Sequence, residues 1–106
     1  MTGLNQLRDA LTALTGRVHH YHAPAHETPP YIVWAEDGSN VFSGDNHHAE
    51  TATQGTIDLY SLDEGDQLSG GIQDALDDLP CCGWYLNSVQ YEEDTGLIHW
   101  EWVFEV

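Results

Sequence analysis

The chain has no lysine, and its basic side chains other than histidine are Arg8 and Arg17. Against them stand 18 Asp and Glu residues, which give a formal net charge of −16 over 106 residues. A surface this acidic repels nucleic-acid phosphates and anionic lipid headgroups. We therefore expect no direct binding to nucleic acid.

Long apolar runs and an export signal are also missing. No stretch approaches the roughly 20 apolar residues that a membrane-spanning helix needs, and no basic head or apolar segment follows Met1. The cysteines are the adjacent Cys81 and Cys82, a spacing that suits neither a disulfide framework nor a four-ligand zinc site. These absences favour a soluble chain with reduced thiols and no membrane partner.

What the chain does contain is enough apolar material for one core. Hydrophobic residues make up 41 % of it, including 4 Trp, 5 Tyr and 2 Phe, so disorder is a poor interpretation despite the charge. The length suits one domain, which we expect to span 1–106.

The last ten residues, 97–106, form the strongest pattern in the sequence. Successive strand side chains point to opposite faces, so this stretch has one strongly apolar face. That face carries Ile98, Trp100, Trp102, Phe104 and Val106. It needs a cover, and a strand that reaches the last residue favours a chain that is complete at this end.

Two leucine-rich stripes can supply the cover. Leu4, Leu7, Leu11 and Leu14 recur at helical spacing and predict a helix over about 3–15. A second helix is predicted over 63–79, with Ser61 or Asp63 as its N-cap and Pro80 as its stop. Its apolar stripe is Leu68, Ile72, Leu76 and Leu79.

The remaining segments read as strands and turns. Strands are expected over 17–22, 31–35, 48–61 and 84–91, with a turn at 37–40, a short returning arm at 41–42 and a bulge or bend at Gly55. Together with 97–106, this order predicts an α+β fold. We expect a mostly antiparallel, twisted sheet of four to five strands, covered on one face by the two helices, with a projecting hairpin.

Candidate chemistry is sparse. Two short clusters could ligate a metal ion, but exposed histidines could equally serve as neutral polar residues in a chain without lysine. The clusters are His19, His20 and His22 in one strand, and Asp45, His47 and His48 near a turn. No phosphate loop or nucleophile elbow is present, and no basic residue lies near Cys81 or Cys82 to activate a thiol. We expect neither a cofactor nor enzymatic activity.

Large aromatic residues lie on or beside the expected hairpin. Tyr31, Trp34 and Phe42 could be ordinary core residues or anchors of a protein interface, where aromatics are enriched. The acidity also has two interpretations, because it would suit a pore through which DNA slides without sticking, or solubility alone.

In order and spacing the chain resembles the small tail terminator (tail completion, head–tail joining) proteins of long-tailed bacteriophages. The resemblance rests on an ordered series of segments together with a leading helix. These are Pro30-Tyr-Ile-Val-Trp34, Gly38-Ser-Asn40, Gly44-Asp-Asn46, Thr56-Ile-Asp-Leu-Tyr60, an acidic helix ending near Leu79, a strand from Trp84, and Trp102-Val-Phe-Glu-Val106.

The resemblance implies a structural virion subunit of the tail or neck, assembled in the host cytoplasm. Such a subunit would form a ring with copies of itself, expected to be a hexamer. The ring would cap the tail tube protein and dock to the head–tail connector protein. It also implies a role for the 36–46 hairpin in ring or tube contacts. Our candidate interface residues are Tyr31, Trp34, Asp37, Ser39, Asn40, Phe42 and Asp45.

A different class of function remains open at this point. An acidic DNA mimic that occupies a nucleic-acid-binding protein needs carboxylates arrayed on one exposed surface. Part of such an array could lie along the second helix, at Asp63, Glu64, Asp66, Asp74, Asp77 and Asp78. An unspecialised adaptor domain is a third possibility.

Overall fold

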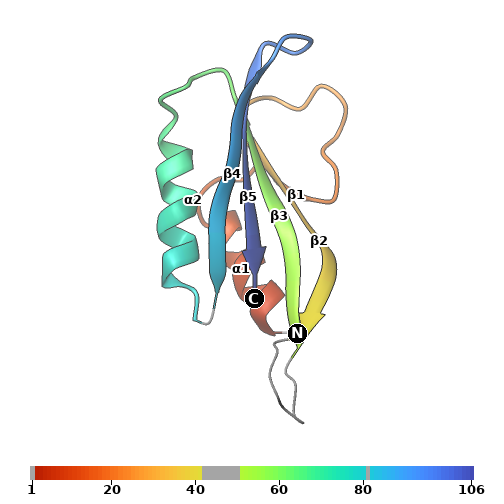
Figure 1. Ribbon diagram of the computed structural model, residues 1–106. Coiled ribbons are helices and arrows are strands. Elements are labelled where there is room, and N and C mark those ends of the chain that lie inside the picture. The colour runs from red at the N-terminus through yellow and green to blue at the C-terminus, as the bar shows by residue number, and fades with distance from the viewer. Residues whose placement is uncertain (1, 42–50, 81) are drawn as a thin grey trace.

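The computed structural model describes residues 2–41, 51–80 and 82–106 (Figure 1). Within these ranges, two helices accompany five strands. In chain order they are α1 (Thr2–Thr12), β1 (Val18–His20), β2 (Tyr31–Val41), β3 (Thr51–Ser61), α2 (Gln67–Asp78), β4 (Gly83–Glu92) and β5 (Leu97–Glu105). Neither helix of the described chain is long and apolar enough to cross a membrane.

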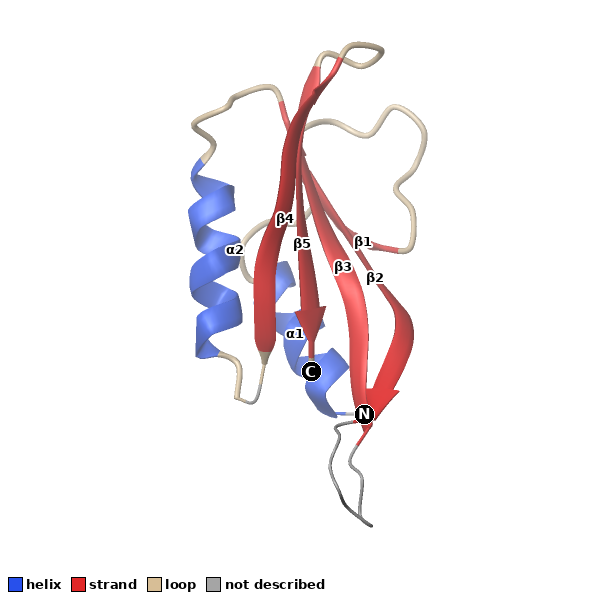
Figure 2. Cartoon of the chain, in the orientation of Figure 1, coloured by secondary structure: helices blue, strands red, loops and turns tan. Residues whose placement is uncertain are grey.

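The strands form one open, twisted sheet in the order β1-β2-β3-β5-β4 (Figure 2). β1 runs parallel to β2, and every other neighbouring pair is antiparallel. The central strand, β3, contacts β2 and β5, so the chain returns from the β2–β3 hairpin to the middle of the sheet. The predicted α+β class and the mostly antiparallel sheet are confirmed.

The core lies between one face of this sheet and the two helices. Trp102 and Phe104 of β5 are completely buried and Trp100 is 6 % exposed, as the alternation in 97–106 predicts. Both leucine-rich stripes cover them. From the helices, the buried side chains are Leu7 and Leu11 of α1 and Ile72 and Leu76 of α2. At roughly 25 cal/mol per Å² of apolar surface, burial of these aromatic rings is a large share of the stability.

Two indole groups fasten α2 to the sheet. The indole N–H of Trp102 donates to the side-chain oxygen of Gln73 over 3.1 Å, and that of Trp84 donates to Asp77 over 2.9 Å. A buried indole without an acceptor would be costly, so these bonds fix which turn of α2 lies over each ring.

The turn predicted at 37–40 is wrong, because β2 continues through this acidic and glycine-containing stretch to Val41. The register shifts between Glu36 and Gly38, opposite Gly55, so a β-bulge absorbs the turn-forming residues. Val41 therefore ends the first arm of the hairpin and does not begin the second, which is β3. The predicted turn at Gly44-Asp45-Asn46 lies outside the described residues.

Three element boundaries also differ from the predictions. α2 begins at Gln67, because Asp66 is the N-cap and accepts from the backbone N–H of Leu68, whereas Asp63 lies in the preceding turn. β1 ends at His20, since Tyr21 takes a positive φ of 76° that a strand does not allow. α1 ends at Thr12, three residues before the predicted end at 15.

Gly55 generates the first testable prediction. A Cβ at this position would lie 2.1 Å from the carbonyl oxygen of Ala35 and 2.7 Å from the ring of Phe104. Neither neighbour can move freely, because one is backbone of the paired strand and the other is fully buried. We expect Gly55→Ala to lower the free energy of unfolding by about 3 kcal/mol or more, measured by urea denaturation.

Gly70→Ala is the matched control, because a Cβ added to this residue of α2 would meet nothing within 4 Å. Removing a helical glycine there should raise the free energy of unfolding by about 0.5–1 kcal/mol. Equal stabilities for the two variants would contradict the close packing at Gly55.

Candidate functional site: a neutral edge strand and an uncovered sheet face

β4 is the outer strand of the sheet and pairs, among the described residues, with β5 alone. In this strongly acidic chain, Glu92 is the one charged residue of β4 and stands at its end. Four of its large hydrophobic side chains are between 42 % and 65 % exposed: Tyr85, Leu86, Val89 and Tyr91. The strand therefore offers an uncharged, apolar edge to solvent.

The register shows why these side chains are uncovered. Leu86, Val89 and Tyr91 lie opposite the inward-facing Trp102, Trp100 and Ile98 of β5, so they belong to the helix-covered face. Their exposure shows that α2, which reaches the outer strand at Trp84, leaves the strand uncovered beyond this residue. Exposed apolar surface combined with unpaired strand backbone is a template for pairing with another chain.

The second surface is the sheet face that carries no helix, which we call the open face. Its side chains lie in rows that follow the strand pairing. One row is aromatic: the ring of Tyr31 stacks on Tyr60 with centroids 4.9 Å apart, and Tyr60 stacks on His99 at 4.3 Å. The next row holds Asp58 and Glu101 beside Val33.

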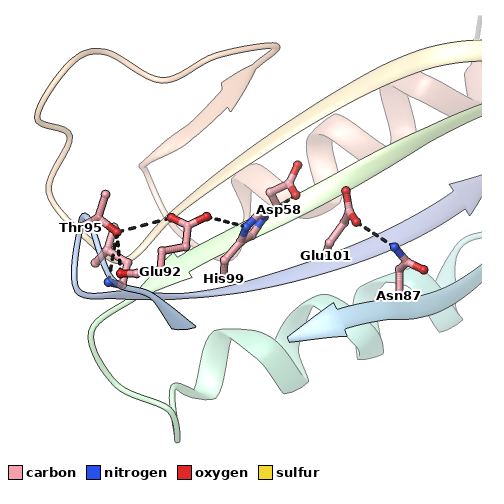
Figure 3. Close-up of polar contacts among 7 residues, drawn as sticks. Asp58, Asn87, Glu92, Thr95, His99 and Glu101 are labelled. Atoms are coloured by element: carbon pink, nitrogen blue, oxygen red, sulfur yellow. Dashed lines mark hydrogen bonds and ion pairs between the residues drawn. The ribbon is translucent and has the colours of Figure 1, made fainter. Parts of the chain in front are cut away.

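His99 is held between two carboxylates (Figure 3). Its Nε2 lies 2.6 Å from an oxygen of Asp58, and its Nδ1 lies 3.0 Å from an oxygen of Glu92. Both ring nitrogens can donate only in the imidazolium form. The hydrogen bond to Asp58 raises the pKa of His99, whereas burial lowers it. The hydrogen bond to Glu92 also raises this pKa.

The carboxylates also act on the neighbouring phenols. Burial and then the charges of Asp58 and Glu92 raise the pKa of Tyr60, and burial with Glu92 raises that of Tyr31. Glu101 accepts a hydrogen bond of 2.9 Å from the side-chain amide of Asn87 at the β4 bulge. The open face is thus a negatively charged surface with fixed side chains.

Two further histidines form hydrogen bonds with carboxylates. His19 bonds to Glu27, and His20 lies 2.7 Å from Glu36 while stacking on Trp34. These hydrogen bonds lower the pKa of both glutamates. In the described residues, no group of three His, Cys, Asp or Glu side chains could hold a metal ion. His47 and His48 lie outside these residues.

The candidate interface residues do not form one surface. Trp34 is 6 % exposed and belongs to the core under the helices, so the prediction that its side chain is an exposed interface residue is wrong. Truncating this side chain would lower the stability of the fold. Tyr31 lies on the open face, Asp37 is exposed at the bulge, and the backbones of Ser39 and Asn40 pair with Thr53 and Ala52. Phe42 and Asp45 lie outside the described residues.

Sequence reasoning missed both surfaces described here, although one signal was readable. The 13 consecutive uncharged residues 79–91, which include most of β4, form the longest uncharged run in a chain with 20 charged residues when His is counted neutral. The His99 cluster gives no such signal, because Asp58 and His99 are 41 positions apart and meet only through the β3–β5 register.

The acidic array proposed for a DNA mimic is not assembled on α2. Asp63, Glu64 and Asp66 precede the helix, and Asp66 is occupied in capping it and in accepting from the hydroxyl of Ser61. Asp77 accepts from the indole of Trp84. Asp74 and Asp78 are the exposed carboxylates of α2 that neither cap the helix nor hold it against the sheet.

The thiol of Cys82 is a weak candidate for chemistry. Burial, with a smaller contribution from Asp77, raises its pKa above the ordinary value. A thiol with a raised pKa is a poor nucleophile at neutral pH. Cys81 lies outside the described residues.

Comparison with known proteins places the chain among the structural proteins of virion tails. A family model described as tail completion protein gp17 matches residues 5–106, and the chain belongs to this family. A search of curated protein sequences finds no match.

Among solved structures, the chain is similar to one described as the virion of a native gene transfer agent particle. The two are 18 % identical, and the alignment covers 97 % of this chain and 88 % of that chain with a TM-score of 0.56. At this identity the likeness supports the shared fold.

His99 generates a prediction about pH. The folded-state pKa lies above the ordinary value of 6.5, so the stabilisation from its ion pairs is fully present below about pH 6.5 and is lost as the pH rises through the folded-state value. We expect the stability of the wild type to fall over this range and His99→Gln to remove that part of the fall, measured by urea denaturation at a series of pH values.

His22→Gln is the control, because His22 is an exposed residue beyond the end of β1. It should keep the wild-type pH profile. A His99→Gln variant with an unchanged profile would show that the cluster does not contribute to folding in this way.

Proposed function

We propose that the protein is the subunit of a ring, expected to be a hexamer, that caps the tail tube and docks to the head connector. The family and the likeness to a virion particle support a tail protein. The ring and its two partners are our inference, and the neutral edge of β4 is the observation that carries it.

The argument starts from charge. Copies with a net charge of −16 repel one another over most of their surface. Contact is least opposed along β4, where the side chains are apolar and the strand between 83 and 91 carries no charge. Burying that edge against a second copy removes apolar surface from water without bringing carboxylates together.

The geometry of the sheet favours a ring over a simple pair. Its two edges differ, since β4 forms one and the short β1 with the free end of β2 forms the other. An interface between unlike patches repeats from subunit to subunit and closes into a ring when the rotation permits. We propose that the β4 edge of one subunit meets the β1–β2 edge of the next.

A ring of this kind explains how tube growth stops. One rim binds the last ring of tube subunits, while the opposite rim differs from a tube subunit and gives the next one no partner surface. We propose that the β2–β3 hairpin contributes to these contacts, through Tyr31, Asp37, Ser39, Asn40, Phe42 and Asp45. Assembly would take place in the host cytoplasm and leave the protein in the tail or neck of the virion.

The interface is tested by the double variant Leu86→Ser/Val89→Ser. Both side chains are exposed, so we expect a folded monomer with a circular dichroism spectrum like the wild type. Ring assembly on purified tails, counted by negative-stain electron microscopy, should fall at least tenfold. The control Leu62→Ser changes a side chain that is 69 % exposed and follows the end of β3, outside the β4 strand, and it should assemble normally. Normal assembly of the β4 variant would reject this edge as the interface.

The capping role is tested in particles produced without this chain. We expect tails of irregular length and heads that lack attached tails, seen by electron microscopy, with both defects reversed by supplying the wild-type chain. Tails of normal length joined to heads would contradict the proposal.

A further inference from the structure

No helix of the described structure covers the open face, and the loop before β2 reaches it only at the end near His19, Tyr31 and Leu97. Both helices pack on the opposite face, where they bury the aromatic side of β5. The open face instead carries Asp58, Glu92, Glu101 and Glu105 on three neighbouring strands. Asp58 and Glu92 pair with His99, and Glu101 and Glu105 add two further carboxylates to the same face.

Apolar and hydroxyl groups separate these carboxylates. The row next to Asp58 and Glu101 holds Thr56 and Val103, and the row on the other side holds the stacked phenol rings of Tyr31 and Tyr60. A long cationic side chain can lay its methylene groups on such surface and place its charged end on a carboxylate.

The charged groups are also held in place before any partner arrives. The side chains of Asp58 and His99 are 17 % and 20 % exposed and bond to each other, while Glu92 is fixed by the second nitrogen of His99. Figure 3 shows this cluster together with Glu101, which Asn87 orients. Fixed side chains lose little conformational entropy on binding.

Charge decides which partner fits. A second copy laid face to face would bring these carboxylates against their own counterparts, and nucleic acid would be repelled by them. A protein surface rich in arginine and lysine could form favourable contacts with each row of side chains on the open face. We propose that the open face is a docking surface for a cationic protein, which binds through arginine or lysine side chains placed beside Asp58, Glu101 and Glu105.

This inference does not depend on ring formation, because Leu86 and Val89, which test the ring, lie on the helix-covered face of the sheet, whereas the docking carboxylates lie on the open face. If the ring exists, it leaves the open face of each subunit for a different protein of the particle. Failure of one proposal would therefore leave the other standing.

The test compares two full-length variants with the same net charge. Glu101→Gln/Glu105→Gln removes two of the four carboxylate charges of the open face, and Asp74→Asn/Asp78→Asn removes two exposed charges from α2. The probe is a short synthetic peptide of alternating arginine and serine, titrated by isothermal calorimetry. We expect the open-face variant to bind about tenfold more weakly than the wild type, and the α2 variant to change by less than twofold. Equal losses, or a larger loss for the α2 variant, would overturn the proposal.

A second measurement uses the unaltered protein, so that it does not rely on the variants folding. Titration of the same peptide into isotopically labelled wild type should shift the amide resonances of Val33, Glu101 and Val103, and the ring resonances of His99. Shifts that concentrate on α2, or that follow acidic residues over the whole surface, would show nonspecific attraction and reject the docking surface.

Discussion

Burial of the aromatic side of β5 is the constraint on which the structure depends. Trp102 and Phe104 must be covered on one face of the sheet. The described part of the chain contains two helices that can cover them. Both are used there, and the indole bonds to Gln73 and Asp77 fasten α2 to the sheet. No helix is left for the opposite face or for the outer strand beyond Trp84, so the surfaces available for other proteins follow directly from how the core is closed.

The parts of the fold set by local periodicity could be predicted from the sequence. The two leucine-rich stripes and the alternation in 97–106 gave the helices, the covered face and the α+β class, because burial follows the 3.6-residue and two-residue periods. The hairpin could not be placed this way. Asp37-Gly38-Ser39-Asn40 has the composition of a turn, yet the last three of these residues pair with β3 and Asp37 forms a bulge within a long strand.

The candidate site was less predictable, because it depends on register. Tyr31 and Trp34 were grouped as neighbours on a hairpin, but they point to opposite faces of β2, and Trp34 is core. The contact of His99 with Asp58 requires knowing that β5 pairs with β3, which no short-range pattern specifies. In this chain without lysine, His19, His20 and His99 each hydrogen-bond to a carboxylate, a role that composition alone did not distinguish from that of solvent-exposed polar residues.

The neutrality of β4 has a consequence for the influence of salt. Charged groups flanking a neutral strand interact across a distance comparable to the Debye length, which is about 8 Å at physiological ionic strength and about 30 Å in dilute buffer. In dilute buffer, carboxylates well beyond the strand still repel another copy. At higher ionic strength this repulsion is screened, so an approaching copy interacts mainly with the uncharged strand. The proposed contacts along β4 would therefore strengthen as salt is added, whereas the proposed contacts between the open face and a cationic surface would weaken. Ionic strength would thus act in opposite directions on the two surfaces of one small protein.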